Sequence, residues 1–294
     1  MKFGSVENAE EIDFTLPKDH IDTKSVLEKS KSAKFKAYVG CSKWNKKDIK
    51  GFYPRGTKDE LAYYSQHFNC IELNALAYGR KPPQVVQNWY DSTTPDFRFF
   101  PKFSQAITHY RRLNDVEEYV ENFVISVSNL KEKLGGLFLQ LNANFAPKDI
   151  DRVFRFFENW THDIPLAAEF RHTDWYNDES IAKQLYEFFE KFGVTNVIVD
   201  TAGRRDLMHM RLTTPTAFVR YVGANHKSDY SRLDDWVKRI AMWKKQGLEE
   251  LDFFIHQNME KESPLLSAYF IEKLNKKIGT DLAIPETLTK RSQI

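Results

Sequence analysis

The stretch PLAAEFRHT at positions 165–173 carries the clearest fold signal in the chain. It begins as an apolar run typical of a buried strand and ends in an acid, a base and an imidazole. Because an unpaired charge is very costly to bury, such a strand must end at a polar pocket. Four other apolar runs end in charged or amide side chains, at positions 70–74, 197–200, 218–220 and 253–258. The sequence therefore indicates several buried strands that end at one shared site.

Short apolar segments alternate with longer amphipathic ones from residue 36 onward, which is typical of an α/β fold. We predict strands at 36–42, 69–74, 97–102, 136–142, 166–171, 196–200, 217–222 and 252–258. We predict the main helices at 57–68, 83–92, 116–134, 147–160, 178–192, 233–246 and 264–277. Eight strands, each followed by a helix or a loop, predict a single (β/α)₈ TIM-type barrel. A doubly wound open sheet is the alternative.

The pattern predicts one large domain, at residues 35–280, with an extension at each end. Residues 1–34 are charged and show no clear hydrophobic period. We therefore expect this N-terminal extension to pack on the domain surface or to be partly mobile. Residues 281–294 form a C-terminal tail. The chain shows neither an internal repeat nor a low-complexity linker, which favours a single domain.

The charges of the 294-residue chain are nearly balanced, with 43 Lys and Arg against 41 Asp and Glu and a net charge of +2. No global field therefore attracts nucleic acid or an acidic membrane, and we expect neither as a partner. No run of 18 apolar residues and no secretory leader is present, so we predict no membrane span and no signal peptide. The only cysteines, Cys41 and Cys70, lie in predicted strands, which favours a reduced, cytoplasmic location.

Side chains alternate along a strand, so residues two apart share a face. In the stretch at 165–173 this rule places Ala167, Glu169 and Arg171 on the inner face and Phe170 toward the helices. The rule also predicts which polar side chains end the other strands. They are Glu72 with Asn74, Lys102, Gln140, Asp200, Arg220, and His256 or Gln257.

Acids and bases are balanced at these strand ends. The acids are Glu72, Glu169 and Asp200, and the bases are Lys102, Arg171 and Arg220. A metal site would carry an excess of His, Asp and Glu without competing bases. The balanced set therefore predicts a pocket for a small polar or anionic ligand, with no cofactor. A divalent metal is the lesser alternative.

We expect Glu169 to act as the acid or base, with its pKa set by Arg171, and Glu72 and Asp200 to be further catalytic carboxylates. The three bases are expected to bind an anionic group. Further expected ligand-binding side chains are Trp44, Asn74, Tyr78, His109, Gln140, His172, Trp175, His256 and Asn258.

Each of these groups also has a structural interpretation. Glu169 and Arg171 are equally suited to an ion pair that holds the pocket's shape. Asp200 is well placed to cap the turn that follows it, and His256 to be a hydrogen-bonded core residue. In the loop at 41–54, Trp44 either stacks on a ligand or packs across the strand ends. The basic, aromatic loop at 108–112 leaves contact with a nucleic acid as a weak alternative.

Several short segments resemble the YecE-like family, long called domain of unknown function 72. They are GCS at 40–42 with Trp44, GFYP at 51–54, IELN at 71–74 with Tyr78, FFPK at 99–102, ITH at 107–109, LFLQL at 137–141, and EFRH at 169–172 with Trp175. The resemblance runs from about residue 38 to residue 274. It implies a TIM-type barrel and no established activity.

The chain departs from the family pattern at several positions. Lys43 stands where glycine is common, Ile49 where tryptophan is common, and Val222 where histidine is common. The last strand ends in HQN at 256–258 where paired asparagines are usual, and the glycine that normally follows is absent. These changes put a shared family chemistry in question for this chain.

Three hypotheses follow for the function. The first is an enzyme that performs acid–base chemistry on a small polar or anionic substrate, as a lyase, isomerase or hydrolase. The second is a non-catalytic ligand-binding or regulatory protein, which Val222 and the altered last strand favour. The third is a metal-assisted hydrolase or lyase that uses Glu72, Glu169, Asp200 and His256. The sequence leaves the substrate and the oligomeric state open.

Overall fold

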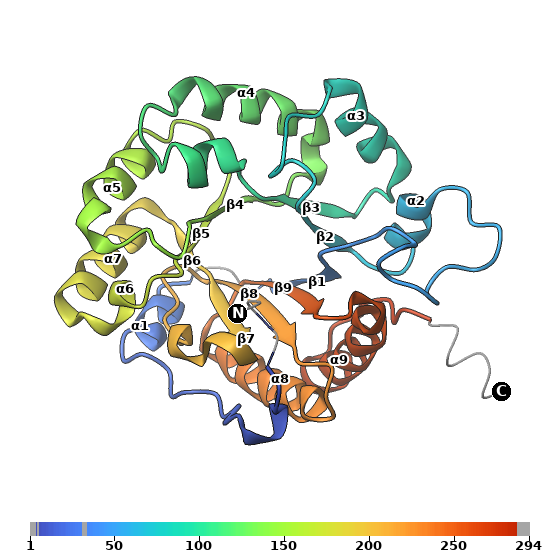
Figure 1. The fold of residues 1–294 in the computed structure, drawn as a ribbon. Coiled ribbons are helices and arrows are strands. Elements are labelled where there is room, and N and C mark those ends of the chain that lie inside the picture. Colours follow the sequence, from blue (N-terminus) through green and yellow to red (C-terminus); the bar gives the residue numbers. More distant parts are fainter. Residues whose placement is uncertain (1–3, 5, 31–33, 287–294) are drawn as a thin grey trace.

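A computed structural model of the chain describes residues 4, 6–30 and 34–286, and its strands form two parallel sheets (Figure 1). In spatial order, the six-stranded sheet contains β3 (Arg98–Pro101), β2 (Cys70–Leu73), β1 (Lys36–Cys41), β9 (Glu250–Gln257), β8 (Thr216–Gly223) and β7 (Ile198–Thr201). The three-stranded sheet contains β4 (Leu137–Gln140), β5 (Leu166–Glu169) and β6 (Thr195–Asn196). Every pairing between these strands is parallel, which confirms the predicted α/β class.

The two sheets are neighbours at both margins. At one margin, isolated parallel bridges join Phe99 to Leu134 and Lys102 to Phe138, next to β3 and β4. At the other margin, only Val197 separates β6 from β7 in the chain. The strand predicted at 196–200 is therefore present as two short segments that pair with different sheets.

The helices lie around the outside of the strands (Figure 1). They are α1 (Thr23–Glu28), α2 (Glu60–Ser65), α3 (Pro83–Ser92), α4 (Glu117–Val127), α5 (Ile150–Glu158), α6 (Asp174–Asn177), α7 (Glu179–Phe192), α8 (Ser228–Gln246) and α9 (Ser263–Ile278). The prediction for α3 is confirmed. The helix predicted at 116–134 instead ends at Val127 and continues as a 3₁₀ segment, Ser128–Lys133. The helix predicted at 233–246 begins earlier, at Ser228.

Local sequence signals explain where several helices begin and end. Asp178 accepts hydrogen bonds from the backbone N–H of Ser180 and Ile181, so it caps the start of α7. Gly193 closes that helix in the left-handed region, with φ 65°. At the end of α3, the ammonium of Lys133 donates to the carbonyl oxygens of Tyr90 and Thr93, at 2.6 and 2.8 Å. This lysine satisfies acceptors that the helix end leaves without an intrahelical partner.

Four phenylalanines form a layer between the strands, one each from β3, β4, β8 and β9. Phe218 lies 5.0 Å from Phe254 and 5.3 Å from Phe138 between ring centres, and Phe254 lies 5.2 Å from Phe100. Their neighbours along each strand pack toward the helices, as the alternation rule predicts. The residues two positions further on therefore stand above this layer at the carboxyl ends of the strands.

The described part of the N-terminal extension packs along α8. The Asp19 carboxylate accepts from Arg239 at 2.5 Å and from the indole N–H of Trp243 at 2.9 Å. Further toward the N-terminus, the Gly4 carbonyl accepts from Asn258 Nδ2 at 2.9 Å, and Gly4 is buried. The extension thus contacts the carboxyl ends of the strands as well as the helix layer. The tail predicted at 281–294 lies largely outside the described residues.

Asp252 lies at the opposite end of the inner space, two residues before Phe254 on β9. It is 3% exposed, and its Oδ1 has no hydrogen-bond partner among the described residues. Burial, assisted by the negative charge of Glu250, raises the pKa of this carboxyl well above its ordinary value. The neutral form of Asp252 is therefore favoured in the folded protein.

We predict that Asp252→Asn stabilises the protein at pH 8 by about 1–3 kcal/mol. The folded-state pKa of Asp252 is raised. The free energy that neutral Asp252 contributes to wild-type stability is therefore fully present below the ordinary carboxyl pKa of about 4 and is lost as the pH rises through the folded-state pKa. Urea unfolding at a series of pH values measures the difference, which should shrink toward pH 4. Asp151→Asn, on the exposed face of α5, is the control. A stability difference between the wild-type protein and Asp252→Asn that stays constant with pH would contradict the raised pKa of Asp252.

Candidate functional site

Polar side chains from six strands meet above the phenylalanine layer. We call this group the strand-end cluster, and its members are Glu72, Lys102, Gln140, Glu169, Arg171, Arg220 and His256. Each lies in the carboxyl-terminal half of its strand or within two residues after its end, and parallel strands all end at the same edge. The predicted convergence of these strand ends is present in the structure.

Arg220 is the common partner within the cluster. Its Nε and Nη2 donate to the two carboxylate oxygens of Glu72 at 2.7 and 2.9 Å. Its Nη1 donates to Glu169 at 2.6 Å. The guanidinium carbon lies 5.5 Å from the ring centre of Phe138, so the cation rests on the phenylalanine layer. One guanidinium therefore neutralises two fully buried carboxylates from β2 and β5.

Glu169 accepts three hydrogen bonds that stabilise its negative charge. Besides Arg220, it accepts from Arg171 Nε at 2.5 Å and from Gln140 Nε2 at 2.9 Å. Burial alone would raise the pKa of this carboxyl, but the charges of Arg171 and Arg220 and the Gln140 hydrogen bond lower it to about 2. Glu169 is therefore ionised across the neutral range.

Glu72 is held in a similar way on the opposite side of Arg220. Asn74 Nδ2 donates to it at 2.8 Å, and His256 Nε2 lies 2.9 Å from its other oxygen. Burial opposes ionisation, but Arg220 and His256 hold the pKa of Glu72 well below its ordinary value. Both buried carboxylates thus serve to position Arg220.

Lys102 differs from the other cations of the cluster. Its Nζ donates to Gln140 Oε1 at 3.1 Å, and within the described part of the chain no carboxylate forms an ion pair with it. Burial, followed by the positive charge of Arg220, lowers the pKa of Lys102 to about 8, although Glu72 and Glu169 oppose the shift. Lys102 therefore changes protonation state near neutral pH.

Partly exposed side chains form a rim above the buried cluster. His109 is half-buried, and its Nδ1 lies 2.8 Å from the Thr108 hydroxyl. Burial, with the charges of Lys102 and Arg171, lowers the pKa of His109. The Tyr78 ring centre lies 5.9 Å from Lys102 Nζ, and this ring is 72% exposed. A small molecule that reaches Lys102 would contact this rim first.

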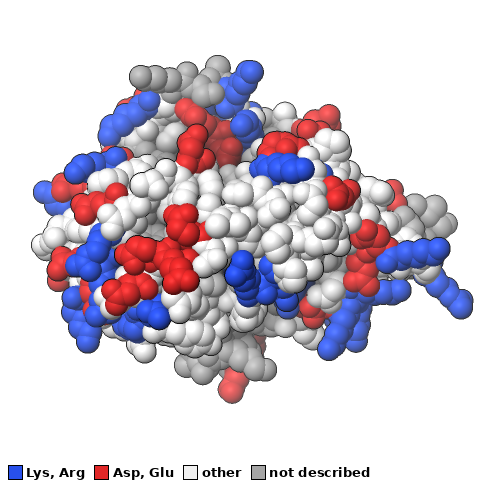
Figure 2. Space-filling view, turned by 90° about the horizontal axis from the view of Figure 1, so that it is seen from above, with Lys and Arg blue, Asp and Glu red and all other residues white. Residues whose placement is uncertain are grey.

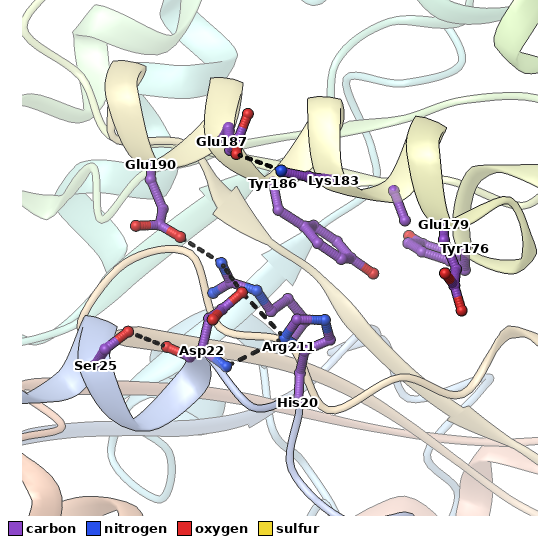
Figure 3. A pocket seen from close by; sticks show the side chains of 11 residues that line it. His20, Asp22, Ser25, Tyr176, Glu179, Lys183, Tyr186, Glu187, Glu190 and Arg211 are labelled. Carbon is purple, nitrogen blue, oxygen red and sulfur yellow. Dashed lines mark hydrogen bonds and ion pairs between the residues drawn. The ribbon is translucent and has the colours of Figure 1, made fainter.

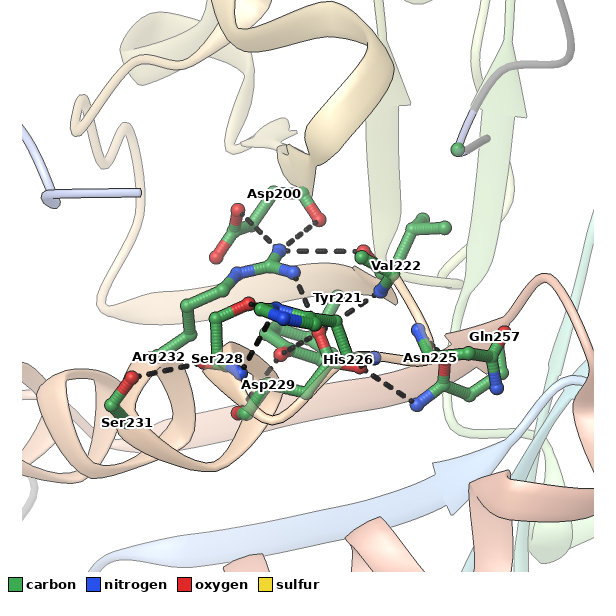
Figure 4. A network of polar contacts seen from close by, with 12 residues as sticks. Asp200, Tyr221, Val222, Asn225, His226, Ser228, Asp229, Ser231, Arg232 and Gln257 are labelled. Carbon is green, nitrogen blue, oxygen red and sulfur yellow. Dashed lines mark hydrogen bonds and ion pairs between the residues drawn. The ribbon is translucent and has the colours of Figure 1, made fainter. Parts of the chain in front are cut away.

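Asp200 corrects the sequence prediction. On β7 the inner position is taken by Val199, so Ile198 and Asp200 point toward the helices. Figure 4 shows Asp200 beside Arg232, whose Nη2 donates to it at 2.8 Å, and the Trp236 indole donates to it at 2.7 Å. Alternation along the strand therefore places Asp200 outside the strand-end cluster, with α8 as its partner.

The polar network around Asp200 organises the first turn of α8 (Figure 4). The Asp229 carboxylate accepts from the backbone N–H of Ala224 at 2.9 Å and from Arg232 Nη1 at 3.0 Å. Gln257 Nε2 also donates to Asp229, at 3.3 Å, so Gln257 faces the helix layer. Of the two residues considered for the last strand, His256 is the one in the cluster.

Four residues predicted to bind ligand have structural partners elsewhere. The Trp175 indole donates to the Phe145 carbonyl at 2.7 Å and is fully buried. Trp44 packs edge-on against Trp89, with 5.9 Å between ring centres. His172 lies 3.6 Å from Asp174, and Asn258 donates to Gly4. Each of the four side chains thus has a contact within the protein, and its role in ligand binding stays a prediction.

No group of three or more His, Cys, Asp or Glu side chains is placed to hold a metal ion among the described residues. The set considered for a metal site does not converge, because Asp200 lies with α8 and Arg220 stands between Glu72 and Glu169. The donor atoms of both glutamates are already directed at this guanidinium.

A separate cavity of about 670 Å³ lies between the N-terminal extension and α7 (Figure 3). Arg211 lines it and forms ion pairs with Glu190 and, at 3.6 Å, with Asp22. Lys183 pairs with Glu187 on its rim. These charged side chains compensate one another, and none belongs to the strand-end cluster.

The face of the molecule in Figure 2 carries acidic and basic side chains side by side. This agrees with the small net charge of +2. Within the part of the chain that the structure describes, no helix is long and apolar enough to cross a membrane.

Comparison with known proteins defines the class to which this chain belongs. The sequence profile of the family described as "Protein of unknown function DUF72" matches residues 38–289. The chain belongs to this family, which confirms the resemblance found in its motifs. The family description names no activity.

Individual relatives support this assignment. The chain is 27% identical over 274 residues to the UPF0759 protein YecE of Escherichia coli, which covers 85% of this chain and 97% of YecE. It is 29% identical over 149 residues to the UPF0759 protein YunF of Bacillus subtilis, which covers 48% of this chain and 52% of YunF. Among solved structures, a DUF72 family protein of Thermotoga maritima has a TM-score of 0.68 at 26% identity, with 81% of this chain and 99% of that chain covered. A DUF72 family protein of Enterococcus faecalis has the same TM-score at 19% identity, with 86% and 99% covered, and shows the shared fold.

We predict that Arg220→Met destabilises the protein by about 3–5 kcal/mol, because it leaves two buried carboxylates without their counter-charge. Adding Glu72→Gln and Glu169→Gln to this variant should restore much of the loss. Chemical denaturation monitored by circular dichroism measures both effects. Arg152→Met, which removes a partly exposed ion pair with Asp149 at the start of α5, serves as the control and should cost at most about 1 kcal/mol. If Arg220→Met and Arg152→Met lowered the free energy of unfolding equally, Arg220 would not be the group that organises the cluster.

Proposed function

We propose that this protein is an enzyme that performs acid–base chemistry on a small anionic substrate at the carboxyl ends of its strands, with Lys102 as the proton-transfer group. The observation that carries the proposal is the state of Lys102, which is buried, lacks a carboxylate partner among the described residues and has a pKa of about 8. Groups whose pKa lies near the working pH transfer protons most effectively.

The proposal includes closure of the strands into a TIM-type barrel. Two contacts across the sheets support it. Phe138 of the three-stranded sheet packs against Phe218 of the six-stranded sheet, and Glu169 pairs with Arg220 across the same divide. In such barrels the active site lies at the carboxyl ends of the strands, where the strand-end cluster is found.

Lys102 fits the proton-transfer role better than Glu169, which the sequence suggested first. With a pKa of about 2, Glu169 is a poor base at neutral pH. Its hydrogen bonds to Arg171, Arg220 and Gln140 leave it as a positioning residue. Lys102, in contrast, supplies both the neutral and the charged form near pH 8.

The charge of the cluster favours an anion. Lys102, Arg171 and Arg220 contribute three positive charges, and Glu72 and Glu169 contribute two negative ones. The excess of one positive charge attracts an anionic group to the partly exposed Arg171 and to Lys102. Near pH 8 Lys102 exchanges between its charged and neutral forms. With the anionic group held by Arg171, neutral Lys102 takes a proton from the substrate, and the charged Lys102 so formed returns a proton to the product. Lyase, isomerase and hydrolase reactions all use this step.

A second candidate function is ligand binding without turnover, and one observation favours it. Gly4 lies so close to the ends of β8 and β9 that a Cβ there would be 2.5 Å from Val222 Cγ1. Asn258 donates to the Gly4 carbonyl. The N-terminal extension thus occupies part of the strand-end edge, an arrangement suited to a sensor that responds to a ligand.

We predict that the wild-type protein converts at least one anionic compound in a mixture of small metabolites and that Lys102→Met abolishes this conversion while the fold is retained. Proton NMR of the mixture over time measures the conversion, and circular dichroism checks the fold. Lys238→Met, on the exposed face of α8, is the matched control and should keep the activity. Specific broadening of a metabolite signal without conversion would favour the binding function instead.

We also predict that sulfate binding weakens as the pH rises from about 7 to about 9.5, because Lys102 loses its charge around pH 8 while sulfate keeps its own. Sulfate-dependent stabilisation in thermal unfolding measures this affinity. In Lys102→Met the binding should be weaker and nearly independent of pH. An unchanged pH profile in this variant would exclude Lys102 as the titrating group.

A further inference from the structure

We infer that a groove beside Lys102 binds a planar aromatic ring carried by the anionic substrate. The inference rests on the proposed function and names the substrate class as an aryl-substituted anion. The groove encloses about 360 Å³ and lies between the segment after β2, the π-helical segment η2 (Ala106–Tyr110) and α4. Its volume matches the lower end of the range for small-molecule sites.

Three tyrosines with unusually exposed rings line the groove. Tyr78 is 72% exposed, Tyr110 is 77% exposed and Tyr119 is 38% exposed. Large apolar side chains grouped on a surface mark a binding site more often than chance exposure does. Leu76 and Phe123 complete an apolar wall. Such a surface stacks on a flat ring and gains free energy by removing both partners from water.

Ser126 adds a polar group to this wall. Its hydroxyl oxygen is buried and has no hydrogen-bond partner among the residues that the structure describes. A buried hydroxyl without a partner costs free energy, and a ligand atom that bonds to it recovers that cost. Gln105 and Asn122 also line the groove and are neutral, and Arg80 is the one charged side chain among its described lining residues. The groove therefore suits an uncharged ring with one polar substituent.

The groove lies next to the strand-end cluster, and Tyr78 of the rim connects the two. Tyr78 lines the groove, and its ring centre is 5.9 Å from Lys102 Nζ. The segment η2 contributes Ala106 and Tyr110 to the groove. It also carries His109, whose pKa is lowered by burial and by the positive charge of Lys102. A ring in the groove thus leaves its attached anion within reach of Lys102.

The backbone beside the groove adopts uncommon conformations. The segment η2 is π-helical, a conformation that is rare and occurs frequently at functional sites. It is followed by three non-glycine residues in the left-handed region, Arg112, Leu113 and Asp115, with φ of 53°, 62° and 49°. Such residues each cost free energy and cluster near ligand sites. They shape the wall that carries Tyr110.

The opposite side of the strand-end edge is less available to a ligand. There the buried Gly4 packs against Val222 and accepts a hydrogen bond from Asn258. A substrate whose anion contacts Lys102 is therefore directed away from β8 and β9 and toward the groove beside β2 and β3.

The test compares phenyl phosphate, inorganic phosphate and neutral p-cresol as probes, with affinities measured by ligand-observed NMR. Phenyl phosphate should bind the wild-type protein roughly 10- to 30-fold more tightly than inorganic phosphate, because its ring is buried in the groove. The p-cresol probe carries no anionic group and should also bind, through its ring alone. Tyr110→Ala and Gly79→Trp should each reduce the affinity for phenyl phosphate to that for inorganic phosphate, abolish p-cresol binding and leave inorganic phosphate binding unchanged. A Cβ at Gly79 meets no atom within 4 Å, so a tryptophan there has space to block the groove without disturbing the fold.

The two proposals fail in distinguishable ways. Lys102→Met should weaken inorganic phosphate binding but leave p-cresol binding unchanged, which separates the anion site from the groove. One outcome is that inorganic phosphate binds through Lys102, phenyl phosphate binds no more tightly than inorganic phosphate, and p-cresol does not bind. This outcome would overturn the aromatic-ring site in the groove and leave the proposed function standing. If p-cresol binds the groove but no phosphate ester depends on Lys102, the anion site is overturned instead. Preferential binding of glucose 6-phosphate over phenyl phosphate would overturn the assignment of an aromatic ring.

Discussion

The bidentate contact of Arg220 with Glu72, combined with its bond to Glu169, is the interaction on which the rest of the site depends. Three fully or nearly buried charges would be unfavourable singly, but together they neutralise one another above an apolar layer. Because Glu72 comes from β2, Glu169 from β5 and Arg220 from β8, the contact ties both sheets together at one edge. Arg171 and Gln140 also donate to Glu169, and His256 lies against Glu72, so these groups contact the same two carboxylates.

The arrangement also explains why Lys102 is the unusual cation. The carboxylates that would neutralise a lysine are already directed at Arg220, and Glu169 is further bonded to Arg171. Lys102 is left with a neutral partner, Gln140, and with the repulsion of nearby cations. A structural ion cluster of this kind therefore produces a group that titrates near neutral pH. In the proposed function, the Glu169–Arg171 pair holds the site in place and Lys102 transfers the proton.

Alternation along the strands allowed much of the site to be predicted. The inward positions of Glu72, Lys102, Gln140, Glu169 and Arg220 follow from a period of two, and this period is a local property of the backbone. The prediction was wrong for Asp200, because a shift of one residue exchanges the inner and outer faces of a strand. The tyrosine groove was not predicted at all, since its wall combines α4, η2 and the segment after β2. No single stretch of sequence contains that pattern.

The sequence by itself determined the α/β class, the family and the side of each central strand that carries charge, because hydrophobic period and motif spacing are read along the chain. Only the tertiary structure decided which charges meet. Arg220 and Glu72 are 148 positions apart, and their pairing depends on how β2 and β8 are placed around the phenylalanine layer. That placement also determined that Lys102 has no carboxylate partner among the described residues and that it lies beside an aromatic groove. The protonation of a buried group depends on its neighbours in space, so the chemistry of this site is a property of the fold.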